Sequence, residues 1–174
     1  RTFPVCSGWL GSGRDCWASK GILYARLQLP NRAQLDFYSL HLDAGLGDKD
    51  RATRRQQLQF VQQFVEAHSD GQAVVLGGDF NLDSRVAEDR ALVEEFSANL
   101  QLGNSQAWSR SFGNRSAVDY ILYRSGANVQ LELLEAGIAG EFVLNGPVPK
   151  ADIELLPLSD HPALRLRLRV DTSG

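Results

Sequence analysis

Histidines, carboxylates and one carboxamide follow or interrupt apolar runs of the sequence at four places: His41, Asp79 with Asn81, Asp119, and Asp160 with His161. If these places converge, the resulting site contains three carboxylates, two imidazoles and one amide. Carboxylate oxygens hold a hard cation such as Mg²⁺, and a histidine oriented by a carboxylate can take a proton from water. The residue types therefore favour metal-assisted hydrolysis of a phosphoester.

The stretch "GGDFNLD", residues 77–83, directly follows the apolar run "AVVL". Side chains alternate along a strand, which predicts that Asp79 and Asn81 point the same way and that Phe80 points into the protein. Ligands of α/β sheets usually bind where strands end. We therefore expect Asp79 and Asn81 to face a ligand.

Apolar periodicity predicts that strands and helices follow one another as in an α/β or layered α+β domain. Alternating runs joined by Pro30-Asn31 indicate a hairpin, and an amphipathic pattern closed by Gly71 indicates a helix. The polar stretch 103–117 is predicted to be a loop. Strands are expected at 21–30, 33–43, 73–79, 118–125 and 129–136 and at the alternation of Leu and Arg over 164–169, and helices at 51–71 and 87–100.

Size and charge limit the possible functions. The chain has 174 residues, 43% of them hydrophobic, which is enough for one domain with a core. A formal net charge of −3 and a pI near 5.6 give no overall basic field for nucleic acid or anionic membranes. No apolar stretch is long enough to span a bilayer, and the first residues lack the order of a signal peptide. We expect a soluble chain without a transmembrane segment.

The two cysteines, Cys6 and Cys16, lie close together in a glycine-rich segment. With no further cysteine to build a zinc site, they predict a short-loop disulfide, and two free thiols are the alternative. A disulfide favours a secreted or periplasmic location.

Four motifs, in this order over residues 39–164, resemble successive motifs of the endonuclease/exonuclease/phosphatase superfamily: "SLHLDAG", "GGDFNLD", "VDYILY" and "LSDHPAL". The resemblance implies the deoxyribonuclease I-like fold, a four-layer α/β sandwich of two packed sheets with helices outside. The stretch "GRDCWASKGILYARL" is similar to the segment that precedes the histidine motif in secreted bacterial sphingomyelinases. In contrast, "HLDAG" departs from the "HLQA" expected there.

The resemblance also implies catalytic roles. His161 would be the base or contact the scissile phosphate, oriented by Asp119. Asp79 would orient the attacking water, and the roles of Asp79 and His161 could be exchanged. Asn81 would hydrogen-bond the phosphate, and His41 would stabilise the pentavalent transition state.

The resemblance further implies a metal cofactor, with Mg²⁺ first and Mn²⁺ or Ca²⁺ as alternatives. Its ligands are expected to be Asp79, Asn81 and Asp160, the last directly or through water. The superfamily also places a metal-binding glutamate upstream of the histidine motif, and no residue before His41 matches it. Residues 1–174 are thus expected to be one partial domain, the C-terminal half. The remainder is removed, is carried by a second polypeptide, or lies outside the given sequence.

Three functions remain open. The first is a phosphodiesterase acting on a phospholipid such as sphingomyelin, and the second is a secreted deoxyribonuclease. The third is a non-catalytic module or fragment that needs the missing half, because the chain alone is expected to be poorly active or inactive.

The other polar and aromatic residues are assigned structural or surface positions and no catalytic role. Lys20 receives no role, although it could touch substrate. Asp43 is interpreted as a loop former. The tryptophans at the rim of the site are expected to be partly buried, with contact to lipid or base as the alternative: Trp9, Trp17 and Trp108. The arginines are expected to face solvent: Arg51, Arg54, Arg55, Arg165, Arg167 and Arg169.

Overall fold

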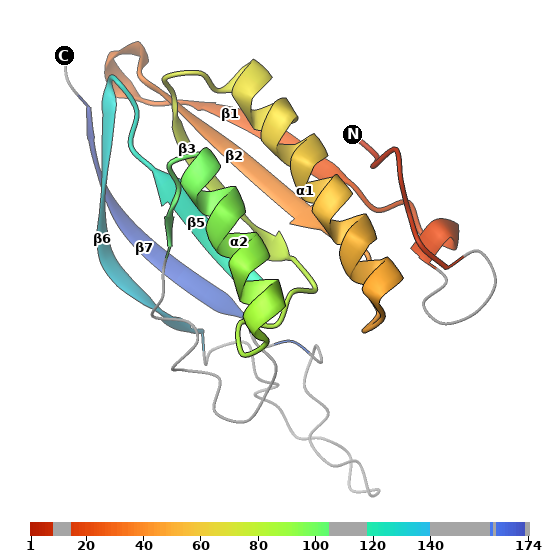
Figure 1. The fold of residues 1–174 in the computed structure, drawn as a ribbon. Helices are drawn as coiled ribbons and strands as arrows, with labels where there is room; N and C mark the ends of the chain where they lie inside the picture. Colours follow the sequence, from red (N-terminus) through yellow and green to blue (C-terminus); the bar gives the residue numbers. More distant parts are fainter. Residues whose placement is uncertain (9–14, 105–117, 140–160, 162, 173–174) are drawn as a thin grey trace, which may run out of the picture.

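A computed structural model of the chain describes residues 1–8, 15–104, 118–139, 161 and 163–172. In these residues two helices cover one face of a five-stranded sheet, and a two-stranded sheet lies on the other face (Figure 1). The mixed α/β architecture is the one predicted from the sequence. The helix–sheet–sheet layers agree with a deoxyribonuclease I-like sandwich.

The five-stranded sheet has the order β1-β2-β3-β5-β4. Its strands β2 and β3 are parallel, because helix α1 connects them, and the other neighbours are antiparallel. The predicted hairpin is confirmed, with a 3-10 turn, η2, between β1 and β2. The bounds are β1 Ile22–Gln28, η2 Pro30–Arg32, β2 Gln34–His41, β3 Ala73–Asp79, β4 Gly103–Asn104 and β5 Asp119–Arg124.

Strand β4 corrects one prediction, since it begins the stretch that was expected to be a loop. Gly103 and Asn104 pair with Tyr123 and Leu122 of β5. Two residues without apolar alternation give no strand signal, and their pairing depends on the edge that β5 offers. Residues 105–117 lie outside the described part of the chain.

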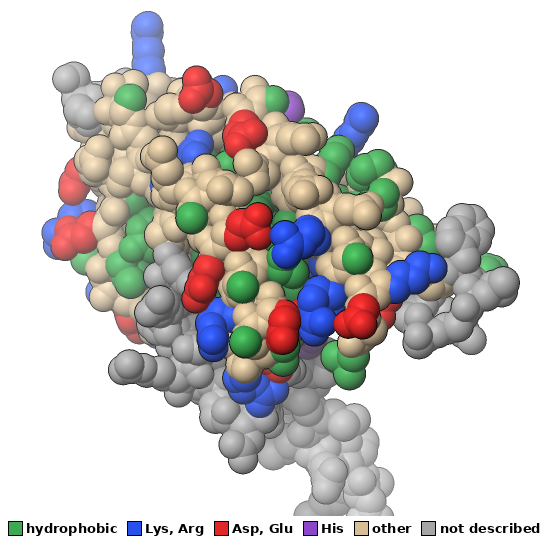
Figure 2. Space-filling view, viewed as in Figure 1, with side chains coloured by type: hydrophobic (Ala, Val, Ile, Leu, Met, Phe, Trp, Pro, Cys, Tyr) green, Lys and Arg blue, Asp and Glu red, His purple; other side chains and the backbone are tan. Residues whose placement is uncertain are grey.

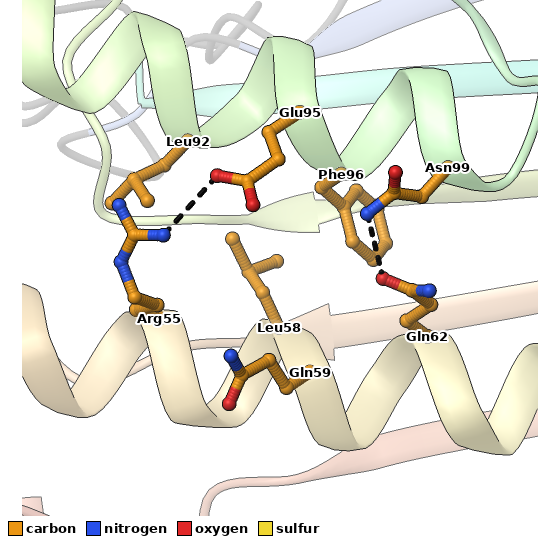
Figure 3. A pocket seen from close by; sticks show the side chains of 8 residues that line it. All are labelled: Arg55, Leu58, Gln59, Gln62, Leu92, Glu95, Phe96 and Asn99. Carbon is orange, nitrogen blue, oxygen red and sulfur yellow. Dashed lines mark hydrogen bonds and ion pairs between the residues drawn. The ribbon is translucent and has the colours of Figure 1, made fainter.

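Helices α1 (Asp48–His68) and α2 (Ala87–Asn99) confirm the two predicted helices. An apolar stripe of α1, including Val61 and Val65, is fully buried against the sheet. On the solvent side, Arg55 of α1 pairs with Glu95 of α2, and these two side chains and Leu58 line a small pocket between the helices (Figure 3). Acidic and basic side chains are interspersed over this helical face (Figure 2).

The two-stranded sheet pairs β6 (Val129–Ile138) with β7 (Leu164–Thr172) in antiparallel register, with a bulge at Leu133/Glu135. Its inner face contributes Val129 and Leu131 to a second core against the five-stranded sheet. The predicted solvent-facing arginines of β7 are exposed, and they pair with glutamates of β6: Arg165 and Arg167 with Glu135, and Arg169 with Glu132.

The N-terminal segment is fastened to the domain by the predicted disulfide, Cys6–Cys16. Cys16 lies in a short 3-10 helix, η1 (Asp15–Trp17), and Thr2 bridges to Gly21 just before β1. Among the described residues, no helix has both the length and the apolar character needed to cross a bilayer.

Candidate active site

His41, Asp79 and Asp119 lie in a row across three neighbouring strands. His41 is the register partner of Asp79 on the parallel strand β3, and Asp79 is the partner of Asp119 on the antiparallel strand β5. His41 Nε2 is 3.3 Å from Asp79 Oδ2. The row lies at the edge of the sheet where β2 and β3 end and β5 begins, so three predicted residues meet there.

Backbone geometry at the end of β3 places Asp79 and Asn81. Gly78 has φ +139°, and a Cβ atom there would lie 2.0 Å from the Leu40 carbonyl oxygen, so only glycine fits beside β2. Phe80 is fully buried, as predicted. The strand stops at Asp79, however, and Asn81 adopts φ +50° in a turn.

The orientation of Asn81 is therefore set by this turn. It is not set by the strand alternation that was predicted from the sequence. The Asn81 backbone N–H donates to Asp79 Oδ1 at 2.8 Å, and its side-chain Nδ2 donates to the Leu42 carbonyl at 2.9 Å. Leu42 in turn donates its N–H to the Asp79 carbonyl. These bonds hold Asn81 beside Asp79 and tie both to the residue that follows His41.

His161 completes the group from a distant part of the sequence. Its Nδ1 is 2.7 Å from Asp119 Oδ2, and both side chains are partly exposed. A carboxylate that accepts a hydrogen bond from Nδ1 leaves Nε2 as the nitrogen that takes up a proton. The pair therefore has the arrangement of a general base and the group that orients it.

The electrostatics of Asp119 reflect a carboxylate whose charge is incompletely compensated. Burial raises the pKa of Asp119 above its usual value, the neighbouring His161 offsets this in part, and the charge of Asp79 raises the pKa further. Two carboxylates this close favour a cation between them.

The chemistry of the donors fits a divalent cation. Asp79, Asp119 and His161 each offer one ligand atom, and these atoms lie within 4.8 Å of one another. This group shares only Asp79 with the predicted ligands. The side-chain nitrogen of Asn81 donates a hydrogen bond to the Leu42 carbonyl. Asp160 lies outside the described residues.

A model of the Endonuclease/Exonuclease/phosphatase family matches residues 4–161. The chain belongs to this family. Curated relatives are the sphingomyelinases of Mycobacterium tuberculosis and Mycobacterium bovis, each 30% identical over 162 residues, covering 84% of this chain and 30% of the relative. The chain thus spans about a third of the length of the curated relatives that it matches.

Solved structures of family members share the fold with low sequence identity. Sphingomyelinase C of Streptomyces griseocarneus is 20% identical with a TM-score of 0.55, covering 79% of this chain and 54% of that one. An endonuclease/exonuclease/phosphatase from Beutenbergia cavernae is 15% identical with a TM-score of 0.61, covering 88% and 40%. A mannosyl-6-phosphatase of Bacteroides thetaiotaomicron is 19% identical with a TM-score of 0.58, covering 85% and 56%.

The prediction for Arg54 was wrong, because this arginine does not face solvent. Only 1% of Arg54 is exposed, and its Nη1 donates to the carbonyls of Asp43 and Gly45 at 3.0 and 2.8 Å. The signal was present in the sequence, since Arg54 shares its helical stripe with the buried Leu58 and Val61.

Asp43, interpreted as a loop former, is the centre of a buried network. Its carboxylate accepts bonds from the Ser7 N–H at 2.6 Å and from Gln57 Nε2 at 2.8 Å, and its own N–H donates to Gln57 Oε1. The departure from the expected "HLQA" therefore gives the loop after β2 a partner in the N-terminal segment.

Lys20, which received no role, also supports this loop. Its ammonium group bonds the Leu42 carbonyl at 2.9 Å and pairs with Asp15 at 2.7 Å, and little of the side chain is exposed. Asp15 additionally accepts the Ala44 N–H at 2.7 Å.

Trp17, expected to be partly buried, is 78% exposed, and Trp9 and Trp108 lie outside the described residues.

Proposed function

We propose that this chain carries the acid–base part of a metal-dependent phosphodiesterase that hydrolyses a phospholipid such as sphingomyelin. The observation that carries the proposal is the His161–Asp119 pair next to Asp79 and His41 at one sheet edge. The family match and the mycobacterial sphingomyelinase relatives support the reaction class and the substrate.

In this proposal, Asp119 holds the His161 ring through Nδ1, and Nε2 accepts the proton of the attacking water. The water oxygen bonds to phosphorus as the bond from phosphorus to the departing oxygen breaks. The departing oxygen keeps the electron pair of that bond and takes up a proton from solvent to become the alcohol. Asp79 orients the water, and sequence and geometry also allow Asp79 and His161 to exchange these roles. His41, more than half exposed, donates a hydrogen bond to the phosphoryl oxygens as charge develops there.

A divalent cation, with Mg²⁺ first and Mn²⁺ or Ca²⁺ as alternatives, would be held by carboxylates of the site and would neutralise charge on the phosphate. Asp79 belongs both to the predicted ligands and to the group that the geometry brings together. Asn81 steadies the loop and presents its remaining amide atoms to the phosphate.

Direct assays test the proposal. Sphingomyelin hydrolysis and plasmid nicking are each measured with Mg²⁺ and with EDTA, on a protein that includes the further part of the domain proposed below. The expected result is Mg²⁺-dependent release of phosphocholine without nicking. His161→Ala should abolish the activity, whereas the matched control His68→Ala, at the exposed end of α1, should not. Equal activity in both variants contradicts the role of His161.

The alternative of a deoxyribonuclease rests on a basic surface for the phosphate backbone, which would make binding fall steeply with salt. The arginines of β7 are engaged by Glu132 and Glu135, and charges of both signs are mixed over the helical face (Figure 2). These observations favour the lipid substrate. Plasmid nicking that weakens with salt would favour the nuclease instead.

We also propose that residues 1–174 are the C-terminal part of the domain and that a further part, in the same or a second polypeptide, covers the open face of the sheet. On the face away from the helices, Leu23, Leu27 and Phe37 are 72%, 46% and 36% exposed. Apolar strand faces of this kind are normally covered.

Intact mass of the native preparation, reduced and non-reduced, tests this arrangement. A larger polypeptide or a second species supports it, and the 174-residue chain alone should then show little turnover. Mg²⁺ binding and full turnover by a single species of 19.2 kDa would contradict both the partial domain and the non-catalytic module.

A secreted or periplasmic location is proposed from the disulfide.

A further inference from the structure

Two large apolar side chains protrude from adjoining segments, Trp17 from η1 and Leu46 from the loop after β2. Leu46 is 98% exposed and Trp17 is 78% exposed, the two highest values among the large hydrophobic residues that the structure describes. The hydrogen bond from the Ala44 N–H to Asp15 Oδ2 joins the loop after β2 to η1. Each protruding residue is two positions from this bond, so both side chains project from one small region.

Leu46 is presented by an ordered turn. It lies between Gly45, with φ +97°, and Gly47, whose N–H donates to Asp50 Oδ2 at 3.1 Å. The buried Arg54 holds the Gly45 carbonyl at 2.8 Å. A Cβ atom at Gly45 would collide with the Asp50 carboxylate at 2.2 Å. The exposure of Leu46 is therefore imposed by the fold.

The residues that precede Trp17 are fixed in place. Its neighbour Cys16 is bonded to Cys6, and Asp15, only 5% exposed, is paired with Lys20. Two covalently and electrostatically fixed residues thus precede an indole that is largely in solvent. Amphipathic indoles are favoured at interfaces between water and lipid.

This region adjoins the candidate active site. The loop leaves His41 through Leu42, whose N–H and carbonyl bond the Asp79 carbonyl and Asn81 Nδ2. Three residues separate Leu42 from Leu46, and the intervening backbone is held by Arg54 and Gln57. A surface that binds Leu46 is thereby placed near the site.

We propose that Trp17 and Leu46 form an apolar anchor that inserts into the surface of a lipid bilayer with uncharged or zwitterionic headgroups. The inference rests on the proposed phospholipid substrate and adds the membrane contact. The residues after Leu46 are Asp48, Lys49 and Asp50, and the whole chain is acidic, so attraction to anionic lipid does not supply the binding. Insertion of apolar side chains, which salt does not screen, supplies it.

Quenching by brominated phosphatidylcholine tests insertion without requiring catalysis. The full chain carries Trp9→Phe and Trp108→Phe, so that Trp17 is the remaining tryptophan, and EDTA prevents hydrolysis. Vesicles of sphingomyelin and brominated phosphatidylcholine should shift Trp17 emission to the blue and quench it, at low and at high salt. Unchanged emission overturns the proposal.

Sedimentation with the same vesicles measures the contribution of each side chain. Trp17→Ser and Leu46→Ser should each weaken binding about tenfold, and together about a hundredfold. The matched control is Leu134→Ser, a 42% exposed leucine at the bulge of β6, which should bind like the wild type. A double variant that binds like the wild type overturns the anchor and would assign these side chains to a protein contact.

The two proposals fail separately. If Trp17 inserts but sphingomyelin is not hydrolysed in the presence of Mg²⁺, the anchor stands and the substrate is wrong. If sphingomyelin is hydrolysed but Trp17 emission does not change, the proposed function stands and the anchor is wrong.

Discussion

The two ends of the central sheet each contain a carboxylate with a basic partner, but the two carboxylates differ in how fully they are compensated. Asp36, in the first half of β2, is completely buried, and Arg26 binds both its oxygens at 2.7 and 2.8 Å. Ser69 and Tyr24 also donate to Asp36. Asp119, at the opposite end, has the His161 ring as its neighbour at 2.7 Å.

The pKa values move in opposite directions as a result. Burial opposes ionisation of Asp36, but the hydrogen bonds from Arg26 and Ser69 outweigh it and hold the pKa below its usual value. Burial dominates at Asp119 and raises its pKa. The fold completes the charge balance where the carboxylate is structural and leaves it incomplete where a cation and a phosphate are proposed to bind.

The largest expected effect separates the two carboxylates by activity. Asp119→Asn should lower hydrolysis about a thousandfold, because an amide no longer stabilises the protonated imidazole, while the melting temperature stays nearly constant. Initial rates and thermal unfolding of the active protein measure both. Asp36→Asn serves as the control and should retain its rate per folded molecule. Equal loss of rate in both variants would remove the distinction.

The reverse effect is expected for stability. Asp36→Ala should lower the free energy of unfolding by about 3 kcal/mol, because Arg26 and two hydroxyl donors lose a buried acceptor. Denaturant unfolding measures the change. Asp70→Ala, at an exposed aspartate just after α1, should change it little. A small effect of Asp36→Ala would mean that the network is dispensable.

The pH dependence of unfolding follows from the lowered pKa of Asp36. Because the unfolded carboxylate binds a proton more readily, its contribution is present above the unfolded pKa of about 4 and is lost as pH falls through the folded value. Wild type should therefore lose stability below about pH 4 more steeply than Asp36→Asn. The groups that contact Asp36, namely Arg26, Tyr24 and Ser69, do not change their protonation state below about pH 4. Parallel slopes in the two proteins would contradict the assignment.

The smallest effect is expected outside both regions. Arg169 and Glu132 form an ion pair on the two-stranded sheet, with more than half of each side chain exposed. Arg169→Ala should change the free energy of unfolding by less than about 1 kcal/mol, since solvent screens exposed pairs. The same denaturant titration shows whether it does. A loss as large as that of Asp36→Ala would mean that burial does not govern these ion pairs.

Local pattern was sufficient for most of the fold. Both helices, the hairpin and the longer strands lie where apolar spacing placed them, because side-chain periodicity is set by neighbours in the sequence. The inward Phe80 was predicted from strand alternation, and the disulfide from two cysteines that lie close together in a chain without a third. The pattern failed for β4, whose two residues form a strand only through pairing with β5.

The candidate site was predicted in composition better than in geometry. His41, Asp79, Asn81, Asp119 and His161 lie together, although their catalytic roles remain predictions. Asn81 is oriented by a turn with positive φ, which strand alternation did not foresee. Asp43 was assigned to a loop because its buried partner Ser7 is remote in the sequence. The burial of Arg54 could have been predicted from its helical stripe, but its carbonyl partners could not.

The sequence by itself determined the elements, the family and the residue types available for phosphoester chemistry, since these depend on short-range spacing and on motifs in order. Only the tertiary structure decided that β5 lies beside β3, which brings Asp119 to Asp79, and that His161 meets Asp119. It also decided which carboxylate is balanced and which is left for a ligand. Register, burial and charge compensation arise from contacts between residues tens of positions apart, which no local pattern encodes.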